Sequence, residues 1–398
     1  MSDAIYHDIA AAYSVAAARA PGLKARFIAA GFDPAEISSL ADLSRLPVMK
    51  KEELLMLQRE NPPFGGFLAA DAKDIAHIYV SPGPIFEPSL PGGGGHGLDL
   101  LFKAAGVGPG DIILNTWSYH LVPAGLLFDQ AARATGATVI PGGVGNRELQ
   151  AQVISEVGVS SVCASTAFFM SLADTVIEAH GRDAWKVKTA FLGGEMGDWM
   201  ATRRRIEADY GVKTWAAYAT ADLGLVAYED GGEGYLVHPD RIVQICDPDS
   251  GVPLATGEVG EIVVTARAAE WPMIRFGTGD SAYALESAQD GRVARLSAIQ
   301  GRVGAAIKVR EIFVYPRAIE EVVIATPGAK AAQAVITREN DRDTLRLHLV
   351  LQDGADRAAA EAAAKEVFQM HARIRADAVV FVETLPENAD LIVNLKDR

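Results

Sequence analysis

The segments GEVGEIVVT (residues 257–265) and IRFGTGD (residues 274–280) decide how the middle of this chain folds. Each joins β-branched or aromatic residues, which favour strands, to glycines, which permit tight turns. Around them, between Leu236 and Leu296, short apolar runs are separated by turn signals such as Asp290-Gly291. Closely spaced strands of this kind predict an antiparallel sheet or a distorted barrel.

Upstream of these segments, short apolar runs alternate with helical patterns. Residues up to about Lys73 read as helices, including residues 5–30 and a helix start at Asp33-Pro34-Ala35-Glu36. Beyond Asp74 the predicted strands are 75–79, 112–115, 138–140, 161–164 and 189–192, and predicted helices include 148–157 and 202–209. This alternation predicts a layered α/β body with a largely parallel sheet.

Downstream, a third pattern begins at about Gly301. The predicted order is strand 306–309, helix 316–325, strands 332–337 and 344–351, helix 355–374 and strand 379–382. This order fits a small α+β domain. The predicted fold class is therefore α/β, with a large layered N-terminal body (residues 1–300) that carries an added antiparallel or barrel-like sheet. A small C-terminal α+β domain (residues 301–398) follows.

Composition narrows the classes of partner. The formal net charge is -14, which disfavours non-specific binding to nucleic acid or anionic lipid. The two cysteines, Cys163 and Cys246, are too few for a disulfide framework or a multi-cysteine zinc site. We see no signal peptide and no apolar run long enough to span a bilayer. We therefore expect a cytoplasmic protein without nucleic-acid or membrane partners and without zinc.

Several further segments, in the same order and spacing, carry a family resemblance. They are LPVMKKEEL (46–54), GVGPGD (106–111), GATVIP (136–141), GGE (193–195) and RRRIE (203–207). Together with segments 257–265 and 274–280, they resemble the adenylate-forming (acyl-CoA synthetase) superfamily, and within it the phenylacetate–CoA ligase-like branch. The resemblance implies a large body and a small lid joined by a hinge. It also implies activation of a carboxylic acid with ATP, followed by transfer of the acyl group to CoA.

The phosphate-binding loop departs from the family pattern. Family members carry a loop rich in small and hydroxylated residues that ends in Lys-Pro, whereas this chain has SPGPIFEP (81–88). Pro82 and Pro84 remove backbone donors, and Glu87 takes the place of the lysine. We therefore predict that ATP is not held in the usual way. A glycine run at 92–95 follows, which is either an anion-binding turn before a helix or a flexible loop.

Other nucleotide-facing positions are retained. By resemblance, Tyr218 contacts the adenine, Asp280 accepts hydrogen bonds from the ribose, and Arg302 is the arginine before the hinge. Asp222 keeps the magnesium-binding carboxylate on a shorter side chain, whereas Ala221 replaces the phosphate-binding threonine. The alternatives are a helix cap for Asp222 and structural ion pairs for Asp280 and Arg302.

The lid and the acyl pocket complete the set of candidate residues. Leu391 stands at the position of the family's adenylation lysine, and Lys396, five residues on, is a poor replacement. By analogy, Trp117, Tyr119 and His120 line the substrate pocket. His120, Glu195 and Asp222 are the acid–base candidates, although His120 also reads as a satisfied histidine at a strand end.

Three functions remain open from the sequence. The favoured one is a divergent enzyme that binds an aromatic or other carboxylic acid, or its CoA thioester, and acts on the acyl-CoA with adenylation lost or impaired. The second is an ATP-dependent, AMP-forming aryl-acid–CoA ligase with an altered phosphate loop. The third is a non-catalytic protein that sequesters an aromatic metabolite. The expected ligand is a CoA thioester rather than ATP and magnesium, and the resemblance is compatible with a homodimer.

Overall fold

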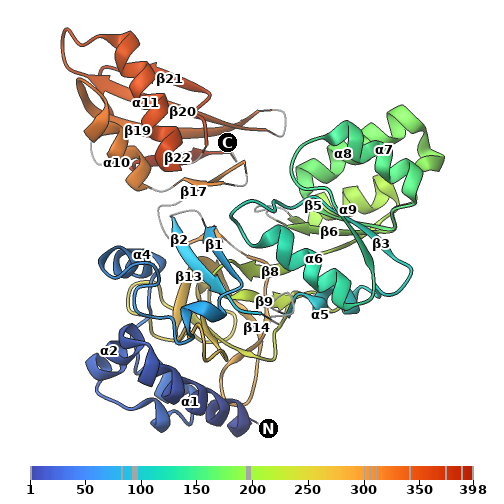
Figure 1. The fold of residues 1–398 in the computed structure, drawn as a ribbon. Helices are drawn as coiled ribbons and strands as arrows, with labels where there is room; N and C mark the ends of the chain where they lie inside the picture. The colour runs from blue at the N-terminus through green and yellow to red at the C-terminus, as the bar shows by residue number, and fades with distance from the viewer. Residues whose placement is uncertain are drawn as a thin grey trace. The chain divides into compact units, whose positions relative to one another are not determined.

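The computed structural model divides into two compact units, Met1–Gly301 (the large unit) and Arg302–Arg398 (the small unit). It describes residues 2–81, 84–91, 97–193, 199–299, 301–303, 307–310, 312–314, 316–339, 342–372, 374–386 and 389–396. In these stretches no helix is long and apolar enough to cross a membrane. Figure 1 shows the elements of each unit.

The large unit opens with helices. They are α1 (Ser2–Arg19), α2 (Pro21–Ala30), η1 (Pro34–Glu36), α3 (Leu40–Ser44), α4 (Lys51–Glu60) and η2 (Ala72–Asp74). The predicted helical stretch 5–30 is broken between α1 and α2, because Ala20 is extended and Pro21 starts a new helix. At η1, Asp33 and Glu36 form the reciprocal side-chain bonds of a capping box.

A five-stranded parallel sheet forms the α/β part of the large unit, in the order β4-β3-β5-β6-β7. The strands are β3 (Ile112–Asn115), β4 (Thr138–Pro141), β5 (Ser161–Ser165), β6 (Thr189–Gly193) and β7 (Lys213–Trp215). The helices are α5 (Asp99–Ala104), α6 (Ala124–Ala134), α7 (Arg147–Val157), α8 (Thr166–His180), η4 (Arg182–Ala184) and α9 (Trp199–Tyr210). Figure 1 shows α7 and α8 on one side of the sheet and α5 and α6 on the other.

Alternating strand residues fill the two cores of this sheet. Leu114, Val162 and Leu192 pack in the cluster that contains α7 and α8 residues. Their chain neighbours Ile113, Cys163 and Phe191 pack in the cluster that contains α5 and α6 residues. Because side chains of a strand alternate between its two faces, strands covered by helices on both sides must be apolar throughout.

Antiparallel strands form the rest of the large unit, as expected from residues 236–296. One sheet has the order β14-β15-β10-β9-β8, and another contains β11, β12 and β13. Their bounds are β8 (Ala217–Thr220), β9 (Gly224–Tyr228), β10 (Tyr235–Val237), β11 (Arg241–Cys246), β12 (Gly260–Ala266), β13 (Phe276–Ala282), β14 (Ala284–Ser287) and β15 (Val293–Leu296). The segments 257–265 and 274–280 thus form most of β12 and β13. A separate hairpin pairs β1 (His77–Ser81) with β2 (Ile85–Ser89).

The small unit is an α+β fold. Its sheet has the order β21-β20-β19-β22, in which β19 and β20 are antiparallel while β22 and β21 run parallel to their neighbours. The bounds are β17 (Ile307–Val309), β18 (Ile312–Val314), α10 (Pro316–Ala325), β19 (Ala329–Glu339), β20 (Arg342–Leu351), α11 (Arg357–Ala372), β21 (Ala378–Phe381) and β22 (Ile392–Leu395), while β16 (Gly301–Arg302) spans the boundary between the two units. Apolar residues of α10 and α11 cover the sheet in one core. The mixed α/β fold class predicted from the sequence is confirmed.

Candidate functional site

The predicted phosphate turn is a tight β-hairpin. Ser81 ends β1 and Ile85 begins β2, so only residues 82–84 connect the strands, and residues 82 and 83 lie outside the described residues. Glu87 pairs with Tyr79 across the hairpin. It therefore lies inside a strand and not on the turn, in contrast to the position expected from the sequence.

Helix α4 is fixed against this hairpin. Gln58 forms two hydrogen bonds with Phe86 of β2: its Nε2 donates to the carbonyl oxygen at 2.8 Å, and its Oε1 accepts from the amide at 2.9 Å. Just before α4, Met49 adds an extended residue beside β13, donating to the Arg275 carbonyl at 2.8 Å and accepting from the Gly277 amide at 2.9 Å. These contacts set the position of Lys51, the first residue of α4.

Lys51, Asp222 and Glu87 form a charged cluster between α4, β2 and the turn after β8. The Lys51 Nζ lies 2.8 Å from the Asp222 Oδ2, with side-chain exposures of 19% and 1%. Glu87 is 2% exposed, and neither carboxylate oxygen forms a hydrogen bond of normal geometry to any described residue. Burial raises the pKa of Glu87 well above its ordinary value, and the negative charge of Asp222 raises it further, whereas Lys51 opposes the rise. Burial and the neighbouring negative charge thus both favour the protonated form of Glu87.

The replacement Glu87→Gln is expected to flatten the pH dependence of stability. Because the folded-state pKa of Glu87 lies above the ordinary value of 4.5, its contribution to stability is complete below that pH. The contribution is lost as pH rises through the folded-state pKa, because burial disfavours the ionised carboxylate. Glutamine stays neutral, so the variant should gain stability relative to the wild type between pH 5 and pH 8, as measured by urea unfolding.

The control for this comparison is Glu52→Gln, on the exposed side of α4. It should leave the difference in unfolding free energy between pH 5 and pH 8 unchanged. Equal pH dependence in the Glu87→Gln variant and the wild type would show that Glu87 is already ionised at pH 5.

Tyr218 and Asp280, both predicted to face a nucleotide, lie together. The Tyr218 hydroxyl donates to the Asp280 Oδ2 at 2.9 Å, and both side chains are buried.

Arg302 is the first residue of the small unit and is half-buried. Thr220 accepts from the Leu223 amide through its Oγ1 at 3.3 Å and so caps the turn that carries Asp222. No group of three His, Cys, Asp or Glu side chains that could hold a metal ion occurs among the described residues.

The loop from β3 to α6 carries the predicted acyl pocket. It contacts the hairpin, because the Val80 amide donates to the Leu121 carbonyl at 2.8 Å. Trp117 packs 5.9 Å from the Phe128 ring, centroid to centroid. The Tyr119 hydroxyl accepts from Asn115 Nδ2 at 2.8 Å and donates to Asp129 Oδ2 at 3.2 Å. His120, by contrast, is exposed, so its ring does not line a buried pocket.

Gly125 sets the shape of this loop. A Cβ at Gly125 would lie 2.5 Å from the Ser118 carbonyl oxygen and 2.8 Å from the Tyr119 Cγ. We therefore expect Gly125→Ala to push the loop outward and to lower the free energy of unfolding by about 1–3 kcal/mol. Gly108→Ala is the matched control, because its nearest contact would be 3.9 Å away, so it should change stability little in urea unfolding. A Gly125→Ala variant as stable as the control would contradict this packing.

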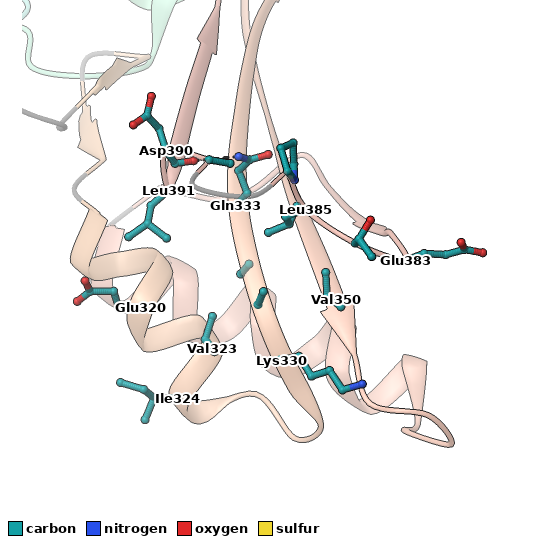
Figure 2. A pocket seen from close by; sticks show the side chains of 15 residues that line it. Glu320, Val323, Ile324, Lys330, Gln333, Val350, Glu383, Leu385, Asp390 and Leu391 are labelled. Atoms are coloured by element: carbon teal, nitrogen blue, oxygen red, sulfur yellow. Dashed lines mark hydrogen bonds between the residues drawn. The ribbon is translucent and has the colours of Figure 1, made fainter.

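The small unit has a groove on one face of its sheet. It has a volume of about 910 Å³ and is lined by residues of α10, β19 and the segment before β22, including Glu320, Ile324, Lys330, Leu385 and Leu391 (Figure 2). It contains none of the large unit's candidate residues. Leu391 packs against the apolar core, and its carbonyl oxygen accepts from the Ala334 amide at 2.9 Å. Lys396 is bound elsewhere, with its Nζ 2.8 Å from Asp343 Oδ2.

The structure thus brings some of the predicted site residues into contact. Tyr218 contacts Asp280, and the loop of Trp117, Tyr119 and His120 reaches the hairpin, while Glu195 lies outside the described residues. Lys51 was not predicted as a site residue. A signal was present, because a lysine at the first position of a helix opposes the helix dipole, which favours the acidic Glu52 and Glu53 there.

Comparison with known proteins identifies the fold and its relatives. No protein-family model matches the chain. It is 28% identical to phenylacetate–CoA ligase of Thermus thermophilus over 81% of this chain and 75% of that protein. It is likewise 28% identical to phenylacetate–CoA ligase of Escherichia coli over 84% of this chain and 79% of that protein.

Solved structures show the same fold. 2-Hydroxyisobutyryl-CoA ligase, in complex with 2-HIB-AMP and CoA in the thioesterification state, superposes with a TM-score of 0.89 at 23% identity, over 99% of this chain and 89% of that one. An amide bond synthetase from Marinactinospora thermotolerans gives a TM-score of 0.57 at 17% identity, over 79% and 67% of the two chains. The chain is therefore similar over most of its length to phenylacetate–CoA ligases and has the fold of an acyl-CoA ligase, in agreement with the resemblance to the adenylate-forming superfamily predicted from the sequence.

Proposed function

We propose that this protein binds a small carboxylic acid as its CoA thioester, acts on that thioester, and does not catalyse ATP-dependent adenylation. The observation that carries the proposal is the closed β1–β2 hairpin. Its strands leave only residues 82–84 between them. A phosphate-binding loop needs several consecutive backbone N–H groups that surround the anion, and two of these three residues are prolines.

Charge in the same region also disfavours a triphosphate. Two buried carboxyl groups, Glu87 on the hairpin strand β2 and Asp222 in the turn after β8, lie in this region, and Lys51 pairs with Asp222. Because Asp222 already neutralises Lys51, this cluster offers no net positive charge to a polyphosphate.

The small unit supports the same conclusion. By resemblance, Leu391 stands where the family carries its adenylation lysine, and it packs against the apolar core of the small unit. Lys396 pairs with Asp343, so it is held away from that role. Losing a preorganised cation of this kind typically lowers a rate by about 10²-fold or more.

The acyl group would lie at the β3–α6 loop, which contributes Trp117 and Tyr119 and contacts the hairpin at Val80. Relatives named for phenylacetate and for 2-hydroxyisobutyrate define two acyl classes to test, one aromatic and one short and hydroxylated. His120, Asp222 and Glu195 remain the acid–base candidates. The exposed ring of His120 can reach a ligand only at the mouth of such a pocket.

The test is a pair of calorimetric titrations on the full chain, one with MgATP and one with phenylacetyl-CoA, repeated with 2-hydroxyisobutyryl-CoA. We expect binding of a thioester and no binding of MgATP. A parallel assay with ATP, CoA and a panel of acids should yield no AMP by mass spectrometry. Tight MgATP binding accompanied by AMP formation would overturn the proposal.

A second candidate is an AMP-forming acid–CoA ligase. The observation that favours it is the buried Tyr218–Asp280 pair, which keeps an aromatic ring and a carboxylate where the family binds adenosine. AMP formation that disappears in Asp280→Ala would support this function over the first.

A further inference from the structure

We propose that the ammonium group of Lys51 takes the place of the divalent metal ion that the family holds at the position of Asp222. The resemblance implies magnesium at this carboxylate. The residues present do not fit it, because the Lys51 Nζ lies 2.8 Å from the Asp222 Oδ2. The inference is independent of the thioester reaction proposed above.

The ammonium and a metal ion compete for this carboxylate. A Mg²⁺ ion binds oxygen at about 2.0–2.1 Å and requires near-octahedral surroundings. An ammonium at hydrogen-bond distance from the same oxygen occupies one approach to it, and two cations that close repel strongly in a site shielded from water. The Asp222 side chain is 1% exposed, so solvent offers little screening.

Lys51 is held in this place by the fold and is not an incidental surface residue. It occupies the first position of α4, where the helix dipole disfavours a positive charge. The two Gln58–Phe86 hydrogen bonds fix α4 on β2, and the Met49 contacts fix the segment before it on β13. The negative charge of the buried Asp222 offsets the unfavourable position of Lys51 at the helix N-terminus.

The oxygen atoms around the pair are those of a hard-cation site. Neither the Glu87 oxygens nor the Asp222 Oδ1 form a hydrogen bond of normal geometry within the described parts of the chain. Ser81, on the same buried face of the hairpin as Glu87, adds a hydroxyl. Without Lys51, these oxygens would meet the preference of Mg²⁺ or Mn²⁺ for carboxylate and hydroxyl ligands.

The test is a Mn²⁺ titration of the full chain, in which the electron paramagnetic resonance signal of the free ion measures how much Mn²⁺ is bound. We expect the wild type and Lys50→Met to bind no Mn²⁺ at Asp222. Lys51→Met should gain one site per chain, at least tenfold tighter than any site in the wild type. Lys50 is the matched control, because its exposed Nζ donates to the Pro248 carbonyl at 2.8 Å and does not contact Asp222.

Two results would overturn the inference. One is a Mn²⁺ site in the wild type that Asp222→Asn abolishes, since the lysine would then not exclude the metal. The other is a folded Lys51→Met variant that gains no site. If Lys51→Met does not fold, Lys51→Gln replaces it in the Mn²⁺ titration, and a folded Lys51→Gln variant that gains no Mn²⁺ site contradicts the inference. Mn²⁺ binding measures no turnover, so its outcome is separate from that of the thioester assay.

Discussion

Replacing Lys51 with methionine is expected to lower the free energy of unfolding of the large unit by about 3 kcal/mol, because it leaves the buried Asp222 carboxylate without its counter-ion. Methionine keeps most of the apolar part of the lysine side chain, so the loss of stability measures the effect of removing the positive charge. The measurement is urea unfolding without divalent metal, followed by tryptophan fluorescence. All five tryptophans lie in the large unit, so the signal reports that unit alone.

Two companion variants make the Lys51 result specific. Lys50→Met removes a neighbouring lysine whose side chain is exposed, and it should cost less than about 1 kcal/mol. Adding Asp222→Asn to Lys51→Met removes the stranded charge and should restore much of the lost stability. Equal losses in the Lys50 and Lys51 variants would show that the Lys51–Asp222 pair does not stabilise the fold.

Arg203→Met is expected to destabilise the large unit by about 3–5 kcal/mol. Arg203, on α9, donates to the Glu229 carboxylate and to the Thr214 carbonyl oxygen, and its Nε lies 3.4 Å from Glu207 Oε1. Glu229 also accepts from the Ala216 amide at 2.8 Å. Arg203 therefore ties α9 to β7 and to the end of β9, and its loss leaves a buried carboxylate unpaired.

The adjacent Arg204 provides the control for Arg203. It is exposed on the same helix, so Arg204→Met should change the unfolding free energy by less than about 0.5 kcal/mol. Burial already raises the pKa of Glu229, and Arg203 opposes that rise. The Arg203→Met variant should therefore lose less stability at pH 5 than at pH 8, because Glu229 can then take up a proton. A loss independent of pH would point to packing and not to charge.

Much of the fold could be predicted because burial pattern and turn chemistry are local. The apolar runs that became β3, β5 and β6 are covered by helices on both faces, so they read as continuous apolar stretches. The break between α1 and α2 was missed, because apolar spacing continued across Pro21 while the proline itself ended the first helix.

The candidate site was predicted in parts. Tyr218 and Asp280 were named separately, and the structure joins them by a hydrogen bond at 2.9 Å. Glu87 was expected on a turn, because prolines at 82, 84 and 88 and a glycine at 83 surround it and favour turns. The strand pairing of Glu87 with Tyr79 corrects that position.

The sequence by itself determined the family resemblance, the α/β body followed by a small α+β unit, and the residues that depart from the family pattern, because these depend on residue type and spacing along the chain. Only the tertiary structure decided that Lys51 meets Asp222, which lies 171 positions away, and that Glu87 faces them from a buried strand. The physical reason is that an ion pair and a raised pKa depend on distance and on exclusion of water. Both are set where α4, the β1–β2 hairpin and the turn after β8 come together.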